Sequence, residues 1–281
     1  MSFSEPKMFG KRTSQFSDAS TVSQVQTIQH RRSPLIADDI DFEVHGAEMQ
    51  FVEIELDPGE SAVAEAGSMM FKDTSITMET AFGDGSQKLQ DSSVFGKLVG
   101  AGKRLITGES LFTTVFTHEG LGKAKVSFAS PYPGHVIPLR LDEIGNKLIC
   151  QKDAFLCAAK GVSIGIEFQR KILTGLFGGE GFIMQSLEGD GWVFVHVGGV
   201  VIEKDLAMGE EIHVDTGCVA AYTAGLEFDL VRTGSVKSMI FGGEGVFFAS
   251  LKGPGKVWIQ TLPISRLAGR IWASTPSSGS N

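Results

Sequence analysis

The chain has 281 residues, 42% of them hydrophobic, and a formal net charge of −8 at pH 7. Nucleic-acid-binding surfaces are usually basic because phosphate neutralisation supplies most of their affinity, so this acidic balance argues against RNA or DNA as a partner. In the sequence, no apolar run approaches the roughly 20 residues that a membrane-spanning helix requires.

The N-terminal segment, residues 1–38, is rich in Ser, Thr and Gln and poor in apolar residues, which predicts a flexible polar extension. A basic, Ser-rich leader is also typical of a mitochondrial transit peptide, but Glu5 and Asp18 interrupt this one. A cytoplasmic protein, at most peripheral to a membrane, is therefore the preferred interpretation. Residues 273–281 form a Ser/Gly/Pro-rich tail that is predicted to be disordered.

Between these ends, residues 39–272 contain a pattern that occurs three times. Each copy begins at an anchor glycine that is followed by alternating apolar residues; the anchors are Gly59, Gly145 and Gly209. Each copy also carries a glutamate beside glycine; these glutamates are Glu109, Glu180 and Glu244. The interval from anchor to glutamate is identical in the second and third copies and longer in the first. Fixed spacing indicates one supersecondary unit in three copies, at about 42–131, 132–199 and 200–267.

Within each copy, short apolar runs are separated by Gly, Pro and Asp. After the first anchor, Ala62 and Ala64 show the period-two spacing of a half-buried strand. A Gly-x-Gly turn follows later in each copy, at Gly120, Gly189 and Gly253. These patterns predict an all-β fold of three tandem β-sandwich-like repeats in a pseudo-threefold arrangement.

The first copy contains an extra segment in which apolar and basic residues alternate along one stretch. Its candidate membrane-contacting or partner-contacting residues are Phe95, Lys97, Leu98, Lys103 and Arg104. A basic amphipathic helix of this kind can lie on a membrane surface or dock on a partner. The favoured alternative is a short helix or loop that covers one end of the β core, because the glycines in the segment weaken helicity.

The three repeated glutamates suggest two different roles. If the copies surround a pseudo-threefold axis, Glu109, Glu180 and Glu244 converge there, and three carboxylates suit a hard cation such as Ca²⁺ or Mg²⁺. The favoured alternative is that each glutamate accepts backbone N–H bonds and fixes a turn. No bound metal is therefore expected.

The sequence shows no complete catalytic constellation. It contains no Gly-x-Ser-x-Gly elbow, P-loop or dinucleotide fingerprint, and no closely spaced histidine pair of the kind that binds zinc. The six histidines are interpreted as surface or hydrogen-bonded strand residues, including His196, which alternates with Trp192 and Phe194. The three cysteines are interpreted as buried, reduced thiols. No catalytic residue and no cofactor is predicted.

Several collinear motifs resemble one known family over residues 42–267. The motifs are Leu56-Asp-Pro-Gly-Glu-Ser, Leu105-Ile-Thr-Gly-Glu-Ser-Leu-Phe, Leu176-Phe-Gly-Gly-Glu-Gly-Phe and Gly253-Pro-Gly-Lys-Val-Trp-Ile-Gln-Thr. The family is known mainly as a domain of unknown function, and its mitochondrial members carry the name "altered inheritance of mitochondria". The resemblance implies a β fold similar to that of the tryptophan RNA-binding attenuation protein, of the double-stranded β-helix type, without implying RNA or tryptophan binding. It also implies a link to inner-membrane organisation for mitochondrial members, and no catalytic residues.

Together these observations predict a non-enzymatic β scaffold that acts through interactions, at a membrane surface or in the assembly of a membrane-associated complex. Because strand edges must be paired or covered, association of the chain with itself is expected, alongside unidentified protein partners. The alternative is a module that binds a small ligand or a cation in a cleft between repeats.

Overall fold

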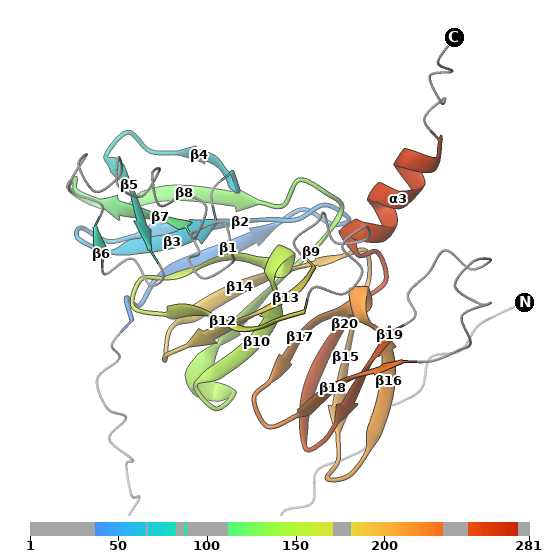
Figure 1. The fold of residues 1–281 in the computed structure, drawn as a ribbon. Coiled ribbons are helices and arrows are strands. Elements are labelled where there is room, and N and C mark those ends of the chain that lie inside the picture. Colours follow the sequence, from blue (N-terminus) through green and yellow to red (C-terminus); the bar gives the residue numbers. More distant parts are fainter. Residues whose placement is uncertain are drawn as a thin grey trace, which may run out of the picture. The chain divides into compact units, whose positions relative to one another are not determined.

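Alternation of apolar and polar residues produces half-buried strands, as β2 (Phe51–Leu56) illustrates. In β2, Val52, Ile54 and Leu56 are fully buried, while the residues between them are partly exposed. A computed structural model of the chain describes residues 37–65, 67–82, 87–88, 112–170, 181–232 and 247–274. Throughout these residues the strands pair in an antiparallel sense (Figure 1).

The described strands form four sheets. The four-stranded sheet has the order β1 (Asp41–His45), β2, β8 (Ala124–Ala129) and β4 (Met69–Lys72). The seven-stranded sheet has the order β6 (Gln87–Lys88), β5 (Ile76–Phe82), β7 (Phe112–His118), β3 (Ser61–Glu65), β11 (Phe155–Ala159), β14 (Trp192–Gly198) and β9 (Gly134–Arg140). The six-stranded sheet has the order β12 (Ser163–Arg170), β13 (Phe182–Glu188), β10 (Lys147–Gln151), β17 (Val219–Thr223), β20 (Gly255–Gln260) and β15 (Val201–Leu206). The three-stranded sheet has the order β16 (Glu211–Asp215), β19 (Phe247–Lys252) and β18 (Glu227–Arg232).

Helical structure is limited to short elements in the described residues. The 3-10 turns are η1 (Leu141–Glu143), η2 (Lys152–Ala154) and η3 (Thr216–Cys218), and the α-helix α3 (Ile264–Ser274) follows β20 (Figure 1). The all-β class predicted from the sequence is therefore confirmed. The α-helix extends past residue 272, where the sequence predicted the start of a disordered tail.

Two strand pairings join segments that are far apart in the sequence. In one, Ala62–Ala64 of β3 pair with Cys157–Ala159 of β11. In the other, Leu148–Cys150 of β10 pair with Ala221–Thr223 of β17. We call these the first and second junctions. Each junction extends a sheet across two different regions of the chain.

The predicted anchor glycines lie in the turns between strands that are consecutive in the chain. Gly59, Gly145 and Gly209 have φ angles of 94°, 90° and 79°. These values lie in the left-handed region, which glycine adopts readily because it has no Cβ. The first of these turns also contains Glu60, whose carboxylate accepts from the backbone N–H of Asp57 at 2.9 Å.

Large aromatic side chains fill the core around the first junction. Phe194 is fully buried, and the ring of Phe42 meets both Phe194 and Trp192 edge-on with centroids 4.9 Å apart. Phe116 and Phe128 form a further edge-on pair at 5.0 Å. Edge-on packing directs the positive edge of one ring at the negative face of the other, so these pairs add directional stabilisation to apolar burial.

The chain before β1 is attached to the sheets by hydrogen bonds. The N–H of Ala37 donates to Asp190 Oδ1 at 3.0 Å, and Asp38 Oδ2 accepts from the N–H of Ser61 at 2.8 Å. Burial raises the pKa of Asp38, although the bond from Ser61 works in the opposite direction. The end of the predicted polar extension thus contacts the β structure.

Candidate functional site

The site residues predicted from the sequence lie outside the described residues. This applies to the repeated glutamates Glu109, Glu180 and Glu244. It also applies to the candidate membrane or partner segment with Phe95, Lys97, Leu98, Lys103 and Arg104. Within the ranges that the structure describes, no cluster of His, Cys, Asp and Glu has the arrangement of a metal site.

The three cysteines Cys150, Cys157 and Cys218 are buried thiols that form no disulfide, as the sequence predicted. Burial raises the pKa of the Cys157 thiol well above its ordinary value. Since the thiolate is the nucleophilic form, this thiol is poorly reactive at neutral pH. These cysteines contribute packing at and near the junctions.

A cavity of about 330 Å³ lies beside the first junction, where the ends of β3 and β8 meet η2, β11 and β14. Gly67 and Ser68, in the turn after β3, line part of this cavity. In this turn Gly67 has a φ of 95°, and the hydroxyl of Ser68 donates to the carbonyl of Glu65 at 2.9 Å. The polar side chains that line the cavity are Glu65, Ser68, Ser130, Tyr132, Asp153 and His196. Its apolar side chains include Phe155, Leu156 and Ile264.

His196 on β14 is the least satisfied polar side chain of this cavity. It is 1% exposed, and neither ring nitrogen has a hydrogen-bond partner among the described residues. Burial and the charge of His135 together lower the pKa of His196 to about 4, although the backbone of Tyr132 works in the opposite direction. The imidazole is therefore neutral at pH 7, with one donor and one acceptor nitrogen.

Tyr132 borders the same histidine. The two rings meet edge-on with centroids 4.5 Å apart, and the Tyr132 hydroxyl donates to the carbonyl of Asp153 at 3.4 Å. Burial raises the pKa of Tyr132, and the negative charges of Asp153 and Glu65 raise it further. Two carboxylates of the cavity thus act on the Tyr132 hydroxyl.

The second junction shows how the corresponding place is filled elsewhere in the chain. Cys157 and Ala221 occupy the same place in the two junctions. Phe194 of β14 pairs with Cys157, and Trp258 of β20 pairs with Ala221. His196 and Gln260, each two residues further along its strand, therefore occupy corresponding positions. Ala64 of β3 pairs with Cys157, and Cys150 of β10 pairs with Ala221. Glu65 and Gln151, the next residues along these strands, therefore also occupy corresponding positions.

Gln260 is fully bonded within the protein. Its Nε2 donates to Gln151 Oε1 at 3.2 Å and to the carbonyl of Gly217 at 2.9 Å. Its Oε1 accepts from the N–H of Gly198 at 3.0 Å. A direct side-chain bond at the second junction is therefore replaced by a cavity at the first.

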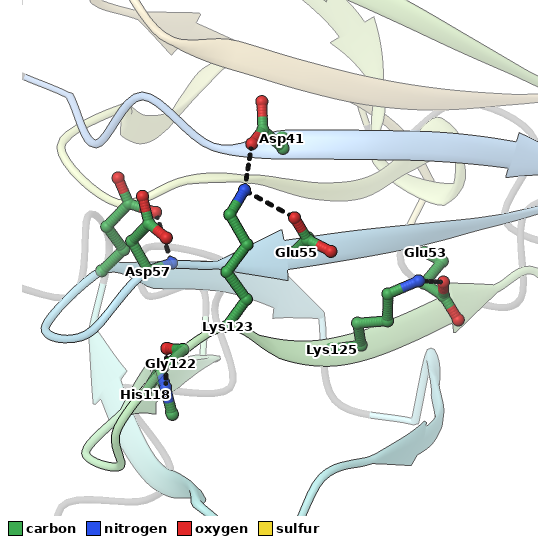
Figure 2. A network of polar contacts seen from close by, with 9 residues as sticks. Asp41, Glu53, Glu55, Asp57, His118, Gly122, Lys123 and Lys125 are labelled. Carbon is green, nitrogen blue, oxygen red and sulfur yellow. Dashed lines mark hydrogen bonds and ion pairs between the residues drawn. The ribbon is translucent and has the colours of Figure 1, made fainter.

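A network of charged side chains covers the outer face of the four-stranded sheet (Figure 2). Lys123 Nζ lies 2.9 Å from Asp41 Oδ2 and 2.6 Å from Glu55 Oε1, and Lys125 pairs with Glu53. The hydrogen bond to Glu55 is the largest cause of the raised pKa of Lys123. Because both lysines are about half exposed and Asp41 is mostly exposed, solvent and salt weaken these attractions. The network is a solvated face with no catalytic geometry.

The strand β4 forms one edge of the same sheet and exposes large apolar side chains. Met70 is 51% exposed and Phe71 is 50% exposed. On the described part of the chain, β4 pairs with β8 alone and β16 pairs with β19 alone. Both strands therefore offer backbone donors and acceptors on their other side.

The helix α3 also exposes apolar side chains near its end, with Ile271 at 60% and Trp272 at 84%. In the described residues, every helix is too short or too polar to cross a bilayer.

His196 is buried, and its ring nitrogens make no hydrogen bond of normal geometry, although the backbone of Tyr132 is close enough to affect its pKa. The sequence interpretation as a surface or hydrogen-bonded strand histidine is therefore not confirmed, because its position on the strand carried no information about partners. The cavity residues Glu65, Tyr132 and Asp153 were not predicted. The available signal was the repeat predicted from the sequence, which places His196 and Gln260 at corresponding positions.

Comparisons with known proteins agree with the resemblance inferred from the motifs. The family model described as mitochondrial biogenesis AIM24 matches residues 42–262. An uncharacterised protein of Streptococcus pyogenes serotype M6 is 33% identical over 236 residues, which cover 82% of this chain and 89% of that protein. The crystal structure of a Streptococcus pyogenes protein is similar with a TM-score of 0.66 and 25% identity, over 84% of this chain and 100% of that one. The chain therefore belongs to the AIM24 family, whose relatives found here are themselves uncharacterised.

Proposed function

We propose that this protein is a non-enzymatic β scaffold, built from three copies of one six-stranded unit, that assembles with further copies of itself through two strand edges. Strand pairing supports the three units. In the first unit the pairings are β2–β8–β4 and β3–β7–β5. In the second they are β9–β14–β11 and β10–β13–β12, and in the third β15–β20–β17 and β16–β19–β18. The order of strands along the chain is the same in each.

Irregularities in the strands support the same division. In each unit, the third strand contains a register shift at the same spacing from the anchor glycine. The shifts lie between Met69 and Phe71, between Phe155 and Cys157, and between Val219 and Ala221. A bulge re-aims the strand and is a specific feature of a backbone, so its recurrence favours one repeated unit.

The junctions between units then follow one rule. The second strand of the first unit, β3, pairs with the third strand of the second unit, β11. The second strand of the second unit, β10, pairs with the third strand of the third unit, β17. By the same rule, β16 of the third unit is left to pair with a β4, and β4 of the first unit is left to pair with a β16.

A contrast in burial is the single observation that carries the self-assembly proposal. Cys157–Ala159 of β11 are 0% exposed at the first junction. Ala221 and Tyr222 of β17 are 0% and 3% exposed at the second. The corresponding Phe71 of β4 is 50% exposed. Phe71 is thus an exposed apolar side chain at a position that is buried at both junctions. This favours pairing of the free edge of β4 with a strand equivalent to β16.

The register of the two junctions specifies the contact between copies. At the junctions, Ala64 pairs with Cys157 and Cys150 pairs with Ala221. Phe71 has the position of Cys157 and Ala221 in its unit, and Val214 has the position of Ala64 and Cys150. The same register therefore places Phe71 of one copy opposite Val214 of the next. Lys72 is then opposite His213, with Glu211 and Asp215 at the diagonal positions. Opposite charges at diagonal cross-strand positions attract, which gives the contact charge complementarity. Two different edges meet, so the assembly is head-to-tail and forms a ring or a filament.

Light scattering coupled to size-exclusion chromatography tests this proposal. We expect the full chain to show a mass that is a multiple of 30.1 kDa and rises with concentration. The Phe71→Lys variant places an ammonium opposite Val214, and we expect its association to be at least tenfold weaker, because the buried charge would have no partner. As a control, Val200→Lys changes another exposed apolar residue, in the turn before β15, and is expected to assemble like the unmodified chain. A constant 30.1 kDa up to about 100 µM, or unchanged assembly of Phe71→Lys, would contradict the proposal.

A further inference from the structure

The apolar face of α3 is partly covered along its first turn and exposed along its last turns. Ile264 and Leu267 are partly buried, and Ile264 lines the cavity at the first junction. Residues three to four positions apart share one face of an α-helix, so Ile271 and Trp272 continue this face. Their side chains are 60% and 84% exposed. The apolar face therefore extends beyond the part of the chain that covers it.

The beginning of α3 is held against the end of β16. Arg266 Nη2 lies 3.3 Å from Asp215 Oδ2, the last residue of that strand. Gly217 in η3 leaves little room for a side chain there, because a Cβ at this position would lie 3.2 Å from the hydroxyl of Ser265. The later turns of α3 project beyond the strands (Figure 1). Exposed apolar residues are thus presented at the end of a helix whose start is fixed.

We infer that α3 binds the surface of an anionic lipid bilayer, with Ile271 and Trp272 inserted at the level of the headgroups. A helix that lies in this interface has an apolar face with Trp or Leu and a polar face with Lys or Arg. The arginines Arg266 and Arg270 stand opposite the apolar face of α3. A tryptophan ring suits this depth because its body is apolar and its N–H reaches polar groups.

Charge favours anionic lipid over neutral lipid. The chain contains no Asp or Glu after Glu244, so α3 and the residues that follow it are free of acidic side chains. Arg266 is paired with Asp215, whereas Arg270 is exposed and lies about 3 Å from Trp272 along the helix axis. The net charge of −8 is spread over the whole chain, and charges more than about 8 Å away are largely screened at physiological salt.

A bilayer also fits the shape of the exposed surface better than an acidic protein does. An acidic protein surface would attract Arg270 equally, but it would need a pocket that matches the indole of Trp272. Lipid chains adapt to an inserted side chain without such a pocket. The bilayer is therefore the occupant that accounts for the apolar and the basic residues together.

Flotation of the full chain with lipid vesicles tests the inference. At low salt we expect binding to vesicles of equal parts phosphatidylglycerol and phosphatidylcholine, and binding about fivefold weaker to phosphatidylcholine alone. Trp272→Ala removes the indole and is expected to weaken binding about tenfold, and Arg270→Gln about fivefold. Met208→Ala is the matched control, because Met208 is 85% exposed in the turn before β16, and it is expected to bind like the unmodified chain.

Vesicles with brominated acyl chains show which residue inserts, because bromine quenches tryptophan fluorescence within the bilayer. Trp258 is 2% exposed and Trp192 is partly buried, so we expect quenching from Trp272. Trp272→Phe is expected to float with the vesicles but to lose the quenching. No flotation at low salt, equal flotation with both lipid compositions, or unchanged flotation of Trp272→Ala would overturn the inference. Phe71→Lys is expected to keep the quenching, so this inference and self-assembly stand or fail separately.

Discussion

Replacing Phe194 by alanine is expected to lower the free energy of unfolding by about 3 to 5 kcal/mol, a typical cost for truncating a fully buried phenylalanine. Phe194 is 0% exposed, and its ring meets that of Phe42 edge-on at 4.9 Å. It also lies on β14, directly opposite Cys157 of β11. The truncation therefore removes apolar contacts at the first junction. Urea unfolding followed by circular dichroism measures the change.

The matched control for this prediction is Leu121→Ala. Leu121 is 98% exposed, so its truncation is expected to change the free energy of unfolding by less than about 0.5 kcal/mol. The slope of the unfolding transition is expected to stay the same in both variants, since the surface exposed on unfolding is nearly unchanged. A loss below about 1 kcal/mol for Phe194→Ala would contradict the packing described for the first junction.

Acid is expected to destabilise the chain through His196. The pKa of His196 is lowered from 6.5 to about 4 in the folded protein, mainly by burial. Between pH 6.5 and 4 the unfolded chain therefore takes up a proton that the folded chain does not, and stability falls as the pH falls. One pKa unit corresponds to about 1.4 kcal/mol, so this residue accounts for a loss of about 3 kcal/mol by pH 4 and for no further loss below it.

Comparison with His196→Gln isolates this contribution, because other groups also titrate in the same range. Burial raises the pKa of Asp38, for example, which works in the opposite direction. As the pH falls from 7 to 4, the free energy of unfolding of the unmodified chain, measured with urea, is expected to fall by about 3 kcal/mol relative to that of His196→Gln. Parallel curves for the unmodified chain and His196→Gln would show that His196 titrates normally.

Much of the fold could be predicted from the sequence because strand periodicity is a local property. Val52, Ile54 and Leu56 alternate with polar residues, and the structure buries them on one face of β2. The anchor glycines mark turns because their positive φ restricts the choice of residue; Gly145 is one of them. The all-β class follows from these two signals together.

Strand partners between distant segments could not be predicted in the same way. Period-two spacing shows which face of a strand is buried, but it does not identify the neighbouring strand. The pairing of β3 with β11 depends on packing between Ala62–Ala64 and Cys157–Ala159, which are all small or apolar and similar to many other segments. The helix α3 was missed although Ile264, Leu267 and Ile271 have helical spacing, because the Ser/Gly-rich residues after it dominated the interpretation.

The candidate site was even less accessible from the sequence. The sequence pattern around a strand histidine is the same whether its ring nitrogens are hydrogen-bonded or not. His196 was therefore interpreted like most histidines, as a surface or hydrogen-bonded residue. The exposure of Phe71 was equally hidden, since a run of Met and Phe indicates a buried strand whether the partner strand belongs to the same chain or to another. Both features become visible only when corresponding positions in the units are compared.

Disulfide cross-linking between copies tests the assembly most directly, with a variant that carries both Phe71→Cys and Val214→Cys. Directly opposed residues on neighbouring strands have Cβ atoms about 4.5 to 5.5 Å apart, close enough for a disulfide after small adjustment. The native cysteines are buried and do not compete. Under mild oxidation we predict a ladder of covalent species at multiples of 30.1 kDa on non-reducing gels, and none from the variant with Lys72→Cys and Val214→Cys, whose side chains face opposite sides of the sheet. Monomer alone from the first variant, or equal ladders from both, would contradict pairing of β4 with β16.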